Sequence, residues 1–559
     1  MSRSDTSTEH APGSGVRELD VAIIGAGVSG MYALYRLRGL GLDVRVYDQA
    51  GDVGGTWWWN RYPGARVDYP GGPFYCYTFS EELVREWDWT ERQPDQPTVL
   101  AYLGHVADKF DLRRDIQLRT KVVAARFDEA AQRWFLETSE GERISAQFLI
   151  AAVGTLSAPN RPDIPGLDDF AGEVHHTGNW PQDRQVEFAG KRVGVVGTGS
   201  SGVQIIPQIA REAASLTVFQ RTPQFALPGR NQALDPALVR DSKENWSEVR
   251  RQIQEFGRPS SLVPSTRSAL EDTEEERQRV FEEAWQKGGV ALRDCYRDLV
   301  TDPVANGHVA EFVRSKIRET VRDPAVAEKL MPEYYFATKR QVMDEGYYEV
   351  YNQDHVTLVD LREEPIETFT PDGVRTAEGE YPLDILVLAT GYDAITGALR
   401  RINPVGRDGL ALEDKWAESS RTYLGLSVVG FPNLFLFHGP GSPSVMFHMF
   451  YGAESQGDWM AECITYMREH GMATIEAVPE AEEAWAADVQ ALASRTLFPQ
   501  TASWFTGANI PGKPREFMVY LAGPRYHENL REVAANDYEG FVFERARTGA
   551  DLEPSAVRG

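Results

Sequence analysis

The feature that most constrains the fold is a glycine-rich turn that occurs twice in the chain. The first copy lies in "LDVAIIGAGVSGMYALYRLRGLGLDVRVYDQ", with Gly25, Gly27 and Gly30 after a short apolar run. The order of residues predicts a strand, a tight turn, a helix and a second strand. In such a unit the first glycine permits the turn, the second lets backbone approach a pyrophosphate, and the third lets helix and strand pack closely. The stretch therefore predicts a dinucleotide-binding unit.

The second copy lies in "KRVGVVGTGSSGVQIIPQIAREAASLTVFQRTP" and contains Gly197, Gly199 and Gly202. The two copies differ where their second strands end, at Asp48 in the first and at Gln220, followed by Arg221 and Thr222, in the second. A carboxylate at this place accepts hydrogen bonds from a ribose diol, whereas a guanidinium favours a 2′-phosphate. The first unit therefore suits FAD or NAD and the second suits NADP, with Arg221 as a solvated surface charge as the alternative.

Two dinucleotide sites in one chain imply electron transfer from a nicotinamide to a flavin. A disulfide reductase of this class needs a close cysteine pair, but Cys76, Cys295 and Cys463 lie far apart in the sequence. We therefore exclude a disulfide reductase and expect a reducing, cytoplasmic location. The predicted fold class is α/β, with two Rossmann-like dinucleotide-binding domains, for FAD and for NADP, and a helical insertion.

Two long motifs indicate which kind of flavin- and nicotinamide-dependent enzyme this is. "GGTWWWNRYPGARVD" and "DFAGEVHHTGNWPQ" fit the patterns GxWxxxxYPGxxxD and FxGxxxHxxxWP. The matching residues are Gly55, Trp57, Tyr62, Pro63, Gly64 and Asp68 in the first, and Phe170, Gly172, His176, Trp180 and Pro181 in the second. With these motifs the chain resembles the type I Baeyer–Villiger monooxygenases, class B flavoprotein monooxygenases, over nearly its whole length. The likeness is nearest to the phenylacetone and cyclohexanone monooxygenase branches.

The resemblance implies an NADPH- and O2-dependent oxidation of a ketone to an ester or lactone through a C4a-peroxyflavin, with sulfoxidation as a side activity. Such chemistry needs a fixed cation beside developing oxyanions. By the match, Arg340 in "FATKRQ" is the catalytic arginine and Asp68 is its carboxylate partner. Lys339 beside it reaches toward the 2′-phosphate of NADP.

The remaining site residues also follow from the resemblance. For FAD they are Gly25, Gly27, Gly30, Asp48, Thr56, Trp57, Asp68, Tyr75 and Val122. For NADP they are Gly197, Gly199, Ser200, Ser201, Gly202, Gln204, Arg221, Thr222, Lys339, Arg340 and Trp504. The loop "HGPGSPSVMFHMFYGAESQ" is expected to line the substrate side of the flavin through Ser444, Met446 and Met449. Its aromatic "VMFHMFY" and the "PGGP" after Tyr69 depart from the nearer relatives, so they bear on substrate range.

His176 occupies the fixed histidine position of the second motif, whereas His175 falls on a variable one. His176 could ligate a metal, act as an acid or base, or only help to hold two parts of the structure together. The sequence shows no His/Cys/Asp cluster with metal-ligand spacing, so we predict no metal site. We expect the motif to be an interdomain connector that anchors the NADP domain while it moves over the flavin; a merely packed linker is the alternative.

The predicted domains are discontinuous. They are a tail over 1–18, an FAD domain over 19–149 and 388–545, an NADP domain over 150–226 and 331–387, a helical insertion over 227–330 and a tail over 546–559. A net charge of −25 argues against nucleic-acid and anionic-membrane partners. The expected partners are a small ketone and O2, in a monomer or weak homo-oligomer without membrane insertion.

Two functions other than ketone oxidation are also compatible with two dinucleotide sites. A related flavin monooxygenase that oxidises nitrogen or sulfur lacks the long first motif. A regulatory protein that senses NADPH would not need Arg340 or Asp68, and both residues are present.

Overall fold

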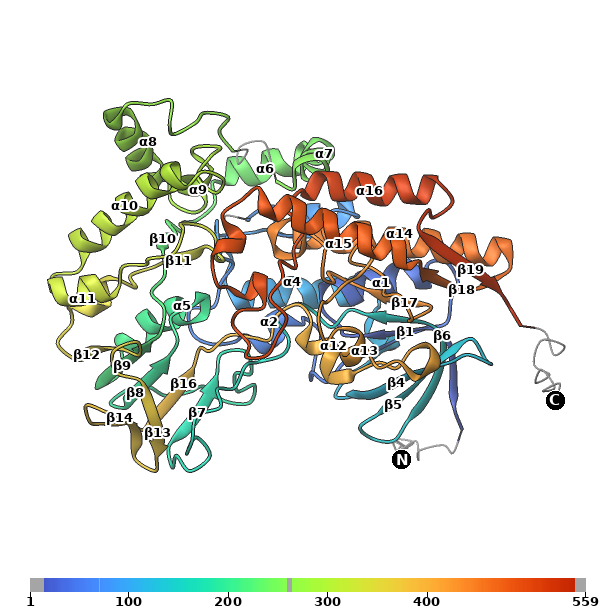
Figure 1. Ribbon diagram of the computed structural model, residues 1–559, viewed down its shortest axis with the longest axis horizontal. Helices are drawn as coiled ribbons and strands as arrows, with labels where there is room; N and C mark the ends of the chain where they lie inside the picture. Colours follow the sequence, from blue (N-terminus) through green and yellow to red (C-terminus); the bar gives the residue numbers. More distant parts are fainter. Residues whose placement is uncertain (1–14, 70, 259–263, 548–559) are drawn as a thin grey trace, which may run out of the picture.

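The computed structural model describes residues 15–69, 71–258 and 264–547. Two mainly parallel sheets lie side by side, with long helices above them (Figure 1). The predicted α/β class with two Rossmann-like units is therefore confirmed. The tail residues 1–14 and 548–559 lie outside the described part of the chain.

The first sheet has seven strands in the order β3-β2-β1-β6-β5-β4, and β17 also pairs with β6. The carboxyl-terminal half of β1 is wholly buried, as expected for a central strand covered on both faces. The strands are β1 (Arg17–Ile24), β2 (Val44–Tyr47), β3 (Ile116–Gln117), β4 (Val122–Asp128), β5 (Arg133–Thr138), β6 (Arg143–Ala151) and β17 (Leu434–Leu436). Thus β1 begins inside the tail predicted over 1–18, and β6 crosses the domain boundary predicted after 149, because pairing between the two strands continues through both places.

The turn after β1 requires glycine for two reasons. Gly25 has φ +107°, and a Cβ there would lie 2.3 Å from the carbonyl oxygen of Ala152. Gly197 repeats this geometry, with φ +104° and the carbonyl oxygen of Ala389 at 2.5 Å. A side chain at either position would be strained and would clash with the neighbouring strand end. The helices that follow are α1 (Val28–Arg38) and α5 (Ser200–Ala210).

The second sheet is wholly parallel, in the order β12-β9-β8-β16-β7. Its strands are β7 (Glu173–His176), β8 (Arg192–Val196), β9 (Ser215–Gln220), β12 (Val356–Asp360) and β16 (Ile385–Leu388). The motif containing His176 therefore supplies the edge strand β7 of the second sheet, and its role as a connector that anchors this domain stays a prediction. Four residues of parallel pairing with β16 fix this segment within the sheet.

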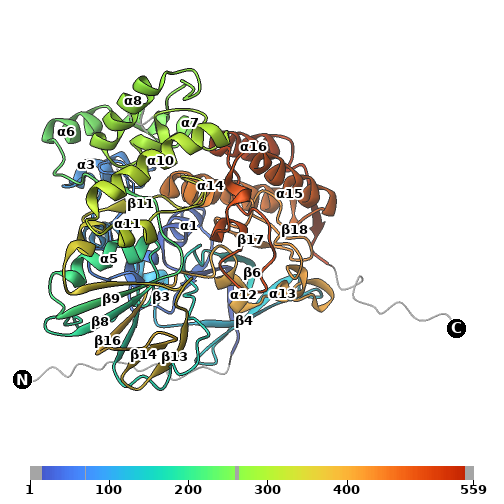
Figure 2. The same cartoon turned by 60° about the vertical axis from the view of Figure 1, so that its left-hand side comes forward.

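The helical insertion lies above α5 and the second sheet in Figure 1, and its helices α6, α7 and α8 lie close together at the top of Figure 2. Its helices are α6 (Pro236–Glu244), α7 (Trp246–Phe256), α8 (Glu274–Lys287), α9 (Ala291–Asp294), α10 (Pro303–Thr320) and α11 (Pro324–Lys329). Phe281, Phe312 and Ile317 are buried on its apolar face, and Trp285 packs against them. Strands β10 (Ala226–Pro228) and β11 (Val342–Asp344) pair at its base.

The remaining elements complete the first domain and the sheet edges. The helices are α2 (Thr56–Trp59), α3 (Glu81–Glu86), α4 (Gln96–Lys109), α12 (Gly397–Ile402), α13 (Leu412–Lys415), α14 (Met449–His470), α15 (Pro479–Ser494) and α16 (Gly523–Ala535). The strands are β13 (Ile366–Thr370), β14 (Gly373–Thr376), β15 (Glu380–Pro382), β18 (Met472–Ala477) and β19 (Phe541–Arg545). Helices α14, α15 and α16 lie above the first sheet (Figure 1).

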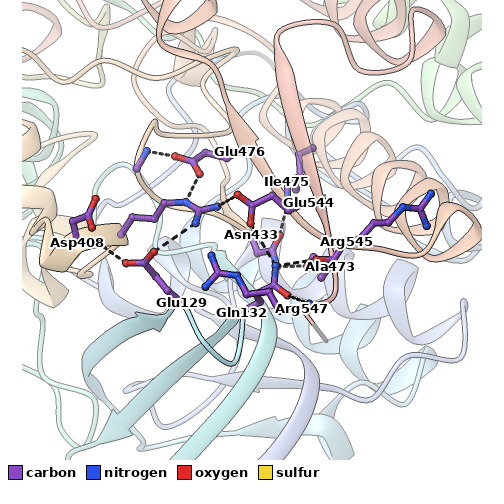
Figure 3. Close-up of polar contacts among 12 residues, drawn as sticks. Glu129, Gln132, Asp408, Asn433, Ala473, Ile475, Glu476, Glu544, Arg545 and Arg547 are labelled. Carbon is purple, nitrogen blue, oxygen red and sulfur yellow. Dashed lines mark hydrogen bonds and ion pairs between the residues drawn. The ribbon is translucent and has the colours of Figure 1, made fainter. Parts of the chain in front are cut away.

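A cluster of charges joins the carboxyl-terminal strand to the first sheet (Figure 3). The Arg407 guanidinium donates to Glu476 at 2.7 Å and to Glu544 of β19 at 2.9 Å. It also lies 3.7 Å from Glu129, in the turn between β4 and β5. Burial disfavours the charge, but the carboxylates of Glu476 and Glu544 outweigh it and raise the pKa of Arg407. One arginine thus links three segments that are distant in sequence.

We expect Arg407→Leu to lower the thermal unfolding midpoint by about 2 °C, because three carboxylates would be left close together without their cation. A partly buried cluster of this kind corresponds to about 2 kcal/mol. Differential scanning calorimetry of the purified protein measures the shift. The matched control is Arg279→Leu, since Arg279 pairs with Glu283 on the exposed face of α8; an equal shift in both variants would contradict a special role for Arg407.

Candidate active site

One large cavity, of about 1260 Å³, contains both glycine turns in its wall. Among the described residues that line it, nine are basic and three are acidic. The whole chain carries a net charge of −25, so this balance is the reverse of the rest of the molecule. A positive cavity in an acidic protein concentrates anions at that place.

The helices that follow the two glycine turns, α1 and α5, have no side-chain cap. Their N-cap residues are Gly27 and Gly199, whereas α4 and α10 are capped by Asp95 and Asp302. The first N–H groups of α1 and α5 are therefore available to an anion. A Cβ at Gly199 would meet no protein atom within 4 Å, so packing within the protein does not require glycine there. Close approach of a pyrophosphate explains it, and both turns fit a dinucleotide.

The ends of the second strands differ as the sequence predicts. Asp48 lines the cavity and accepts hydrogen bonds from the backbone N–H groups of Ala26 at 2.6 Å and Ala50 at 2.7 Å. Burial raises the pKa of Asp48, against those two hydrogen bonds. Gln220, its counterpart, is fully buried and donates to the carbonyl of Lys329. A carboxylate is thus present at this place only in the first unit.

Two cations lie beside the second unit. Lys339 places its Nζ 4.5 Å from the centre of the Tyr334 ring, and Arg221 is exposed at the cavity wall. Burial and the charge of Arg221 lower the pKa of Lys339 to about 8. Neither cation forms an ion pair with any residue in the described part of the chain. Two adjacent cations without a counter-ion fit a 2′-phosphate.

Arg340 and Asp68, 272 positions apart in the sequence, form a bidentate ion pair at the cavity wall. Nε of Arg340 donates to Oδ2 of Asp68 at 2.7 Å, and Nη2 donates to Oδ1 at 2.5 Å. Nη1 donates to the carbonyl of Val445 at 2.8 Å. Burial disfavours the charge of Arg340, but Asp68 outweighs it and raises the pKa of the guanidinium. The arginine therefore stays charged and is held in one orientation.

A guanidinium has five N–H donors, and these contacts use three of them. Two donors of Arg340 therefore remain for reacting oxygens. The aromatic wall next to the pair includes Tyr75, whose ring contacts Trp57 and Phe450 edge-on. Met446, Met449 and Trp504 line the same cavity.

Most of the predicted site residues line this cavity. They are Gly25, Gly27, Asp48, Thr56, Trp57, Asp68, Tyr75, Val122, Gly197, Gly199, Ser200, Ser201, Gln204, Arg221, Thr222, Lys339, Arg340, Trp504, Met446 and Met449. Gly30 and Gly202 lie one turn into their helices, where they pack against the strand turns. Ser444 is buried and is not among the residues that line the cavity, whereas Val445 and Met446 directly after it are, so its substrate-side role stays a prediction.

The five residues of the second motif also lie away from the cavity wall. His176 accepts a hydrogen bond from the N–H of Gly178 at 2.9 Å, and its ring lies edge-on to Tyr392. Burial lowers the pKa of His176 to about 4, so the ring is neutral at physiological pH. Tyr392, which the sequence analysis did not select, also donates to Asn60 in the tryptophan-rich motif. The motif thus contacts the site through Tyr392.

Gln204 connects the two units. Its side-chain oxygen accepts a hydrogen bond from the Tyr62 hydroxyl at 2.7 Å, and its amide donates to the carbonyl of Arg66 at 3.1 Å. Both partners belong to or adjoin the YPG motif of the first domain. The side chain predicted to bind NADP is therefore already engaged between the domains.

No group of three or more metal-ligating side chains occurs in the described ranges. Nor does any helix in the part of the chain that the structure describes have the length and apolar character needed to cross a membrane. All three cysteines are free thiols.

Two dinucleotide turns that open on one cavity define a two-dinucleotide oxidoreductase. The family model described as pyridine nucleotide-disulphide oxidoreductase matches residues 19–256. The chain is 42% identical to a Baeyer–Villiger monooxygenase of Pseudooceanicola batsensis, over 94% of this chain and 97% of the relative. It is 43% identical to a phenazine N-monooxygenase of Lysobacter antibioticus, over 94% and 97%. A solved structure described as oxidised steroid monooxygenase bound to NADP matches with a TM-score of 0.89 and 47% identity, over 95% of this chain and 100% of that one.

The chain belongs to the Baeyer–Villiger monooxygenase family, as its motifs predict.

Proposed function

We propose that this protein is an FAD-containing monooxygenase that uses NADPH and O2 to convert a ketone into an ester or lactone. The observation that carries the proposal is the bidentate Arg340–Asp68 pair in the wall of the cavity that both dinucleotide turns share. When bound, the nicotinamide and the flavin supply the hydride and the activated oxygen for this reaction.

The residues of this chain supply charge and orientation. Arg340 offers two N–H donors to the oxygens on which negative charge develops during attack on the carbonyl. Asp68 and the Val445 carbonyl hold the guanidinium in place, so little reorganisation is needed during the reaction. The aromatic side chains of Trp57 and Tyr75 limit access of water to this wall.

The cofactor assignments follow the two units. We assign FAD to the first, with Gly27 at its pyrophosphate and Asp48 toward its ribose. We assign NADP to the second, with Gly199 at its pyrophosphate and the cation pair of Arg221 and Lys339 at its 2′-phosphate. Supporting this choice, the second unit has no carboxylate at the position of Gln220.

We expect the KM for NADPH to rise above pH 8, by up to about tenfold per pH unit. The pKa of Lys339 is lowered to about 8, so the free protein has this cation below that pH and loses it above. The bound phosphate favours the protonated lysine, so binding must take up a proton at higher pH. Steady-state KM values for NADPH and NADH between about pH 7 and pH 9.5 test this.

NADH is the matched control, because it lacks the 2′-phosphate and its KM should not follow Lys339. Lys339→Met should raise the KM for NADPH at pH 7 and remove its rise with pH. A rise that persists in Lys339→Met would assign the titration to another group.

The experiment that tests the function is product identification by mass spectrometry with linear, cyclic, aromatic and steroidal ketones. An ester or lactone formed with one NADPH per product supports the proposal. A second candidate, N-oxygenation, is favoured by the 43% identity to the phenazine N-monooxygenase. Turnover of N-heteroaromatics to N-oxides, with peroxide release alone from every ketone, would favour that alternative.

We also propose a cytoplasmic protein that is a monomer or weak homo-oligomer and has no nucleic-acid partner. The three free thiols and the net charge of −25 support this.

A further inference from the structure

Two arginines in the cavity wall have no role in the cofactor sites or the reaction described above. Arg258 and Arg293 both line the cavity, and their side chains are 20% and 23% exposed. Both contact Asp294: Nη1 of Arg258 lies 2.7 Å from Oδ2, and Nε of Arg293 lies 2.9 Å from Oδ1. Two guanidiniums thus share one carboxylate, which leaves the three side chains with one positive charge. We call these three side chains the arginine pair site.

The arginine pair site lies at the end of the cavity that contains Arg340. Gln341, the next residue after the catalytic arginine, donates to the carbonyl of Gly289 at 2.9 Å. Gly289 leads through Val290 into α9, which carries Arg293. The loop beside Arg340 and the loop before Arg293 are therefore hydrogen-bonded to each other.

One close packing contact and one electrostatic influence on a neighbouring tyrosine place the site from other directions. Gly257, next to Arg258, packs so closely on Phe447 that a Cβ there would lie 2.3 Å from the Phe447 ring. Phe447 follows Met446 in the substrate-side loop. Tyr69 directly follows Asp68 in the chain, and the charges of Arg258 and Arg293 both act on its hydroxyl. Three separate segments thus bring the arginine pair site to the reacting end of the cavity.

The surface around these arginines is apolar. Phe256 lines the cavity and is 47% exposed, so a large aromatic side chain lies at the rim. Val290, next to α9, and Met446, in the loop that carries Phe447, also line the cavity. An apolar wall with one net positive charge fits an amphiphilic molecule better than a wholly apolar one.

We infer that this end of the cavity binds ketones that carry a carboxylate remote from the carbonyl, with Arg293 as the main anion contact. This inference rests on the proposed function and specifies its substrate class. In the described part of the chain Arg293 hydrogen-bonds only to Asp294, through Nε and Nη2, so its two Nη1 donors are available to a carboxylate. A guanidinium holds a carboxylate by charge-assisted hydrogen bonds. The alkyl or aryl part of the ketone then lies along Val290 and Met446 toward Arg340.

The first test compares methyl-ketone carboxylates, from levulinate to longer homologues, with the primary amide of each acid. In the wild-type holoenzyme we expect kcat/KM for the acid to exceed that for the amide by about tenfold at the best chain length. Arg293→Met should bring this ratio close to one, and Arg293→Lys should keep part of it. The matched control is Arg297→Met, because Arg297 pairs with Glu271 on the exposed side; it should keep the full ratio.

Amides that react as well as acids at every chain length would overturn the inference, and so would an acid preference that survives in Arg293→Met. A second measurement does not depend on turnover. Octanoate should bind the holoenzyme about tenfold more tightly than octanamide in calorimetry, and Arg293→Met should remove the difference. If octanoate binds in this way but no ketone, charged or neutral, gives an ester, the anion site stands and the proposed function fails. If neutral ketones give esters while octanoate and octanamide bind equally, the inference alone fails.

Discussion

Replacing Arg340 with methionine should abolish ester formation while NADPH oxidation continues. Methionine keeps much of the volume of the side chain but removes the charge and both donors available to the reacting oxygens. Loss of a preorganised donor at a developing oxyanion costs about 10²- to 10³-fold in rate, and here the full positive charge is lost as well. We expect ester formation to fall by about a thousandfold or more, measured by gas chromatography with a ketone that the wild type converts.

NADPH oxidation and hydrogen peroxide release, measured in the same reaction, are the internal control. Hydride transfer needs the two dinucleotides in place, and the substitution leaves both glycine turns assigned to their pyrophosphates unchanged. Arg340→Lys should recover a small part of the ester, because an ammonium restores the charge but cannot bind Asp68 in a bidentate way. Ester formation by Arg340→Met at the wild-type rate would show that another cation does this work.

The parts of the fold that the sequence predicts are those with local causes. Each glycine turn lies within about thirty residues of its own two strands, so the strand–turn–helix–strand pattern can be recognised without knowledge of any distant contact. The helical insertion has apolar residues at helical spacing, and Phe281 and Phe312 are buried as that spacing requires. The absence of a carboxylate at Gln220 likewise needs only a comparison of the two copies.

The parts that the sequence does not predict depend on distant contacts. Strand β7 has four residues, and two of them are exposed, so it lacks the apolar pattern that identifies a buried strand. Only its pairing with β16, more than two hundred residues later, makes it a strand. The Val445 contact to Arg340 uses a backbone carbonyl, which has no signature in the sequence. Arg258 and Arg293 are ordinary surface residues until the fold places them at one cavity.

The Arg340–Asp68 pair is predicted from the sequence only in part. Each residue belongs to a motif that resemblance to a family identifies, but neither motif determines the distance between the two side chains. The structure shows that two residues 272 positions apart are brought together so that both oxygens of Asp68 face the guanidinium. Arg340 supplies the positive charge of the site, and Asp68 fixes the orientation of that charge.

For this reason Asp68→Ala should lower ester formation by about a hundredfold although Arg340 keeps its charge. Without the carboxylate, the guanidinium loses two of its three hydrogen bonds and is no longer fixed relative to the ketone; a displacement of about 1 Å is enough to cause a loss of this size. The flavin that remains bound should still accept hydride, so the ratio of peroxide released to ester formed should rise. Rates are expressed per bound flavin, measured by absorbance, because Asp68 also adjoins the proposed FAD site.

The double variant Asp68→Ala/Arg340→Met provides the decisive comparison. If Asp68 acts only by orienting Arg340, the double variant should make ester no more slowly than Arg340→Met alone, since residues that act as a unit are strongly non-additive. A double variant that loses a further hundredfold would instead give Asp68 a role of its own in the reaction.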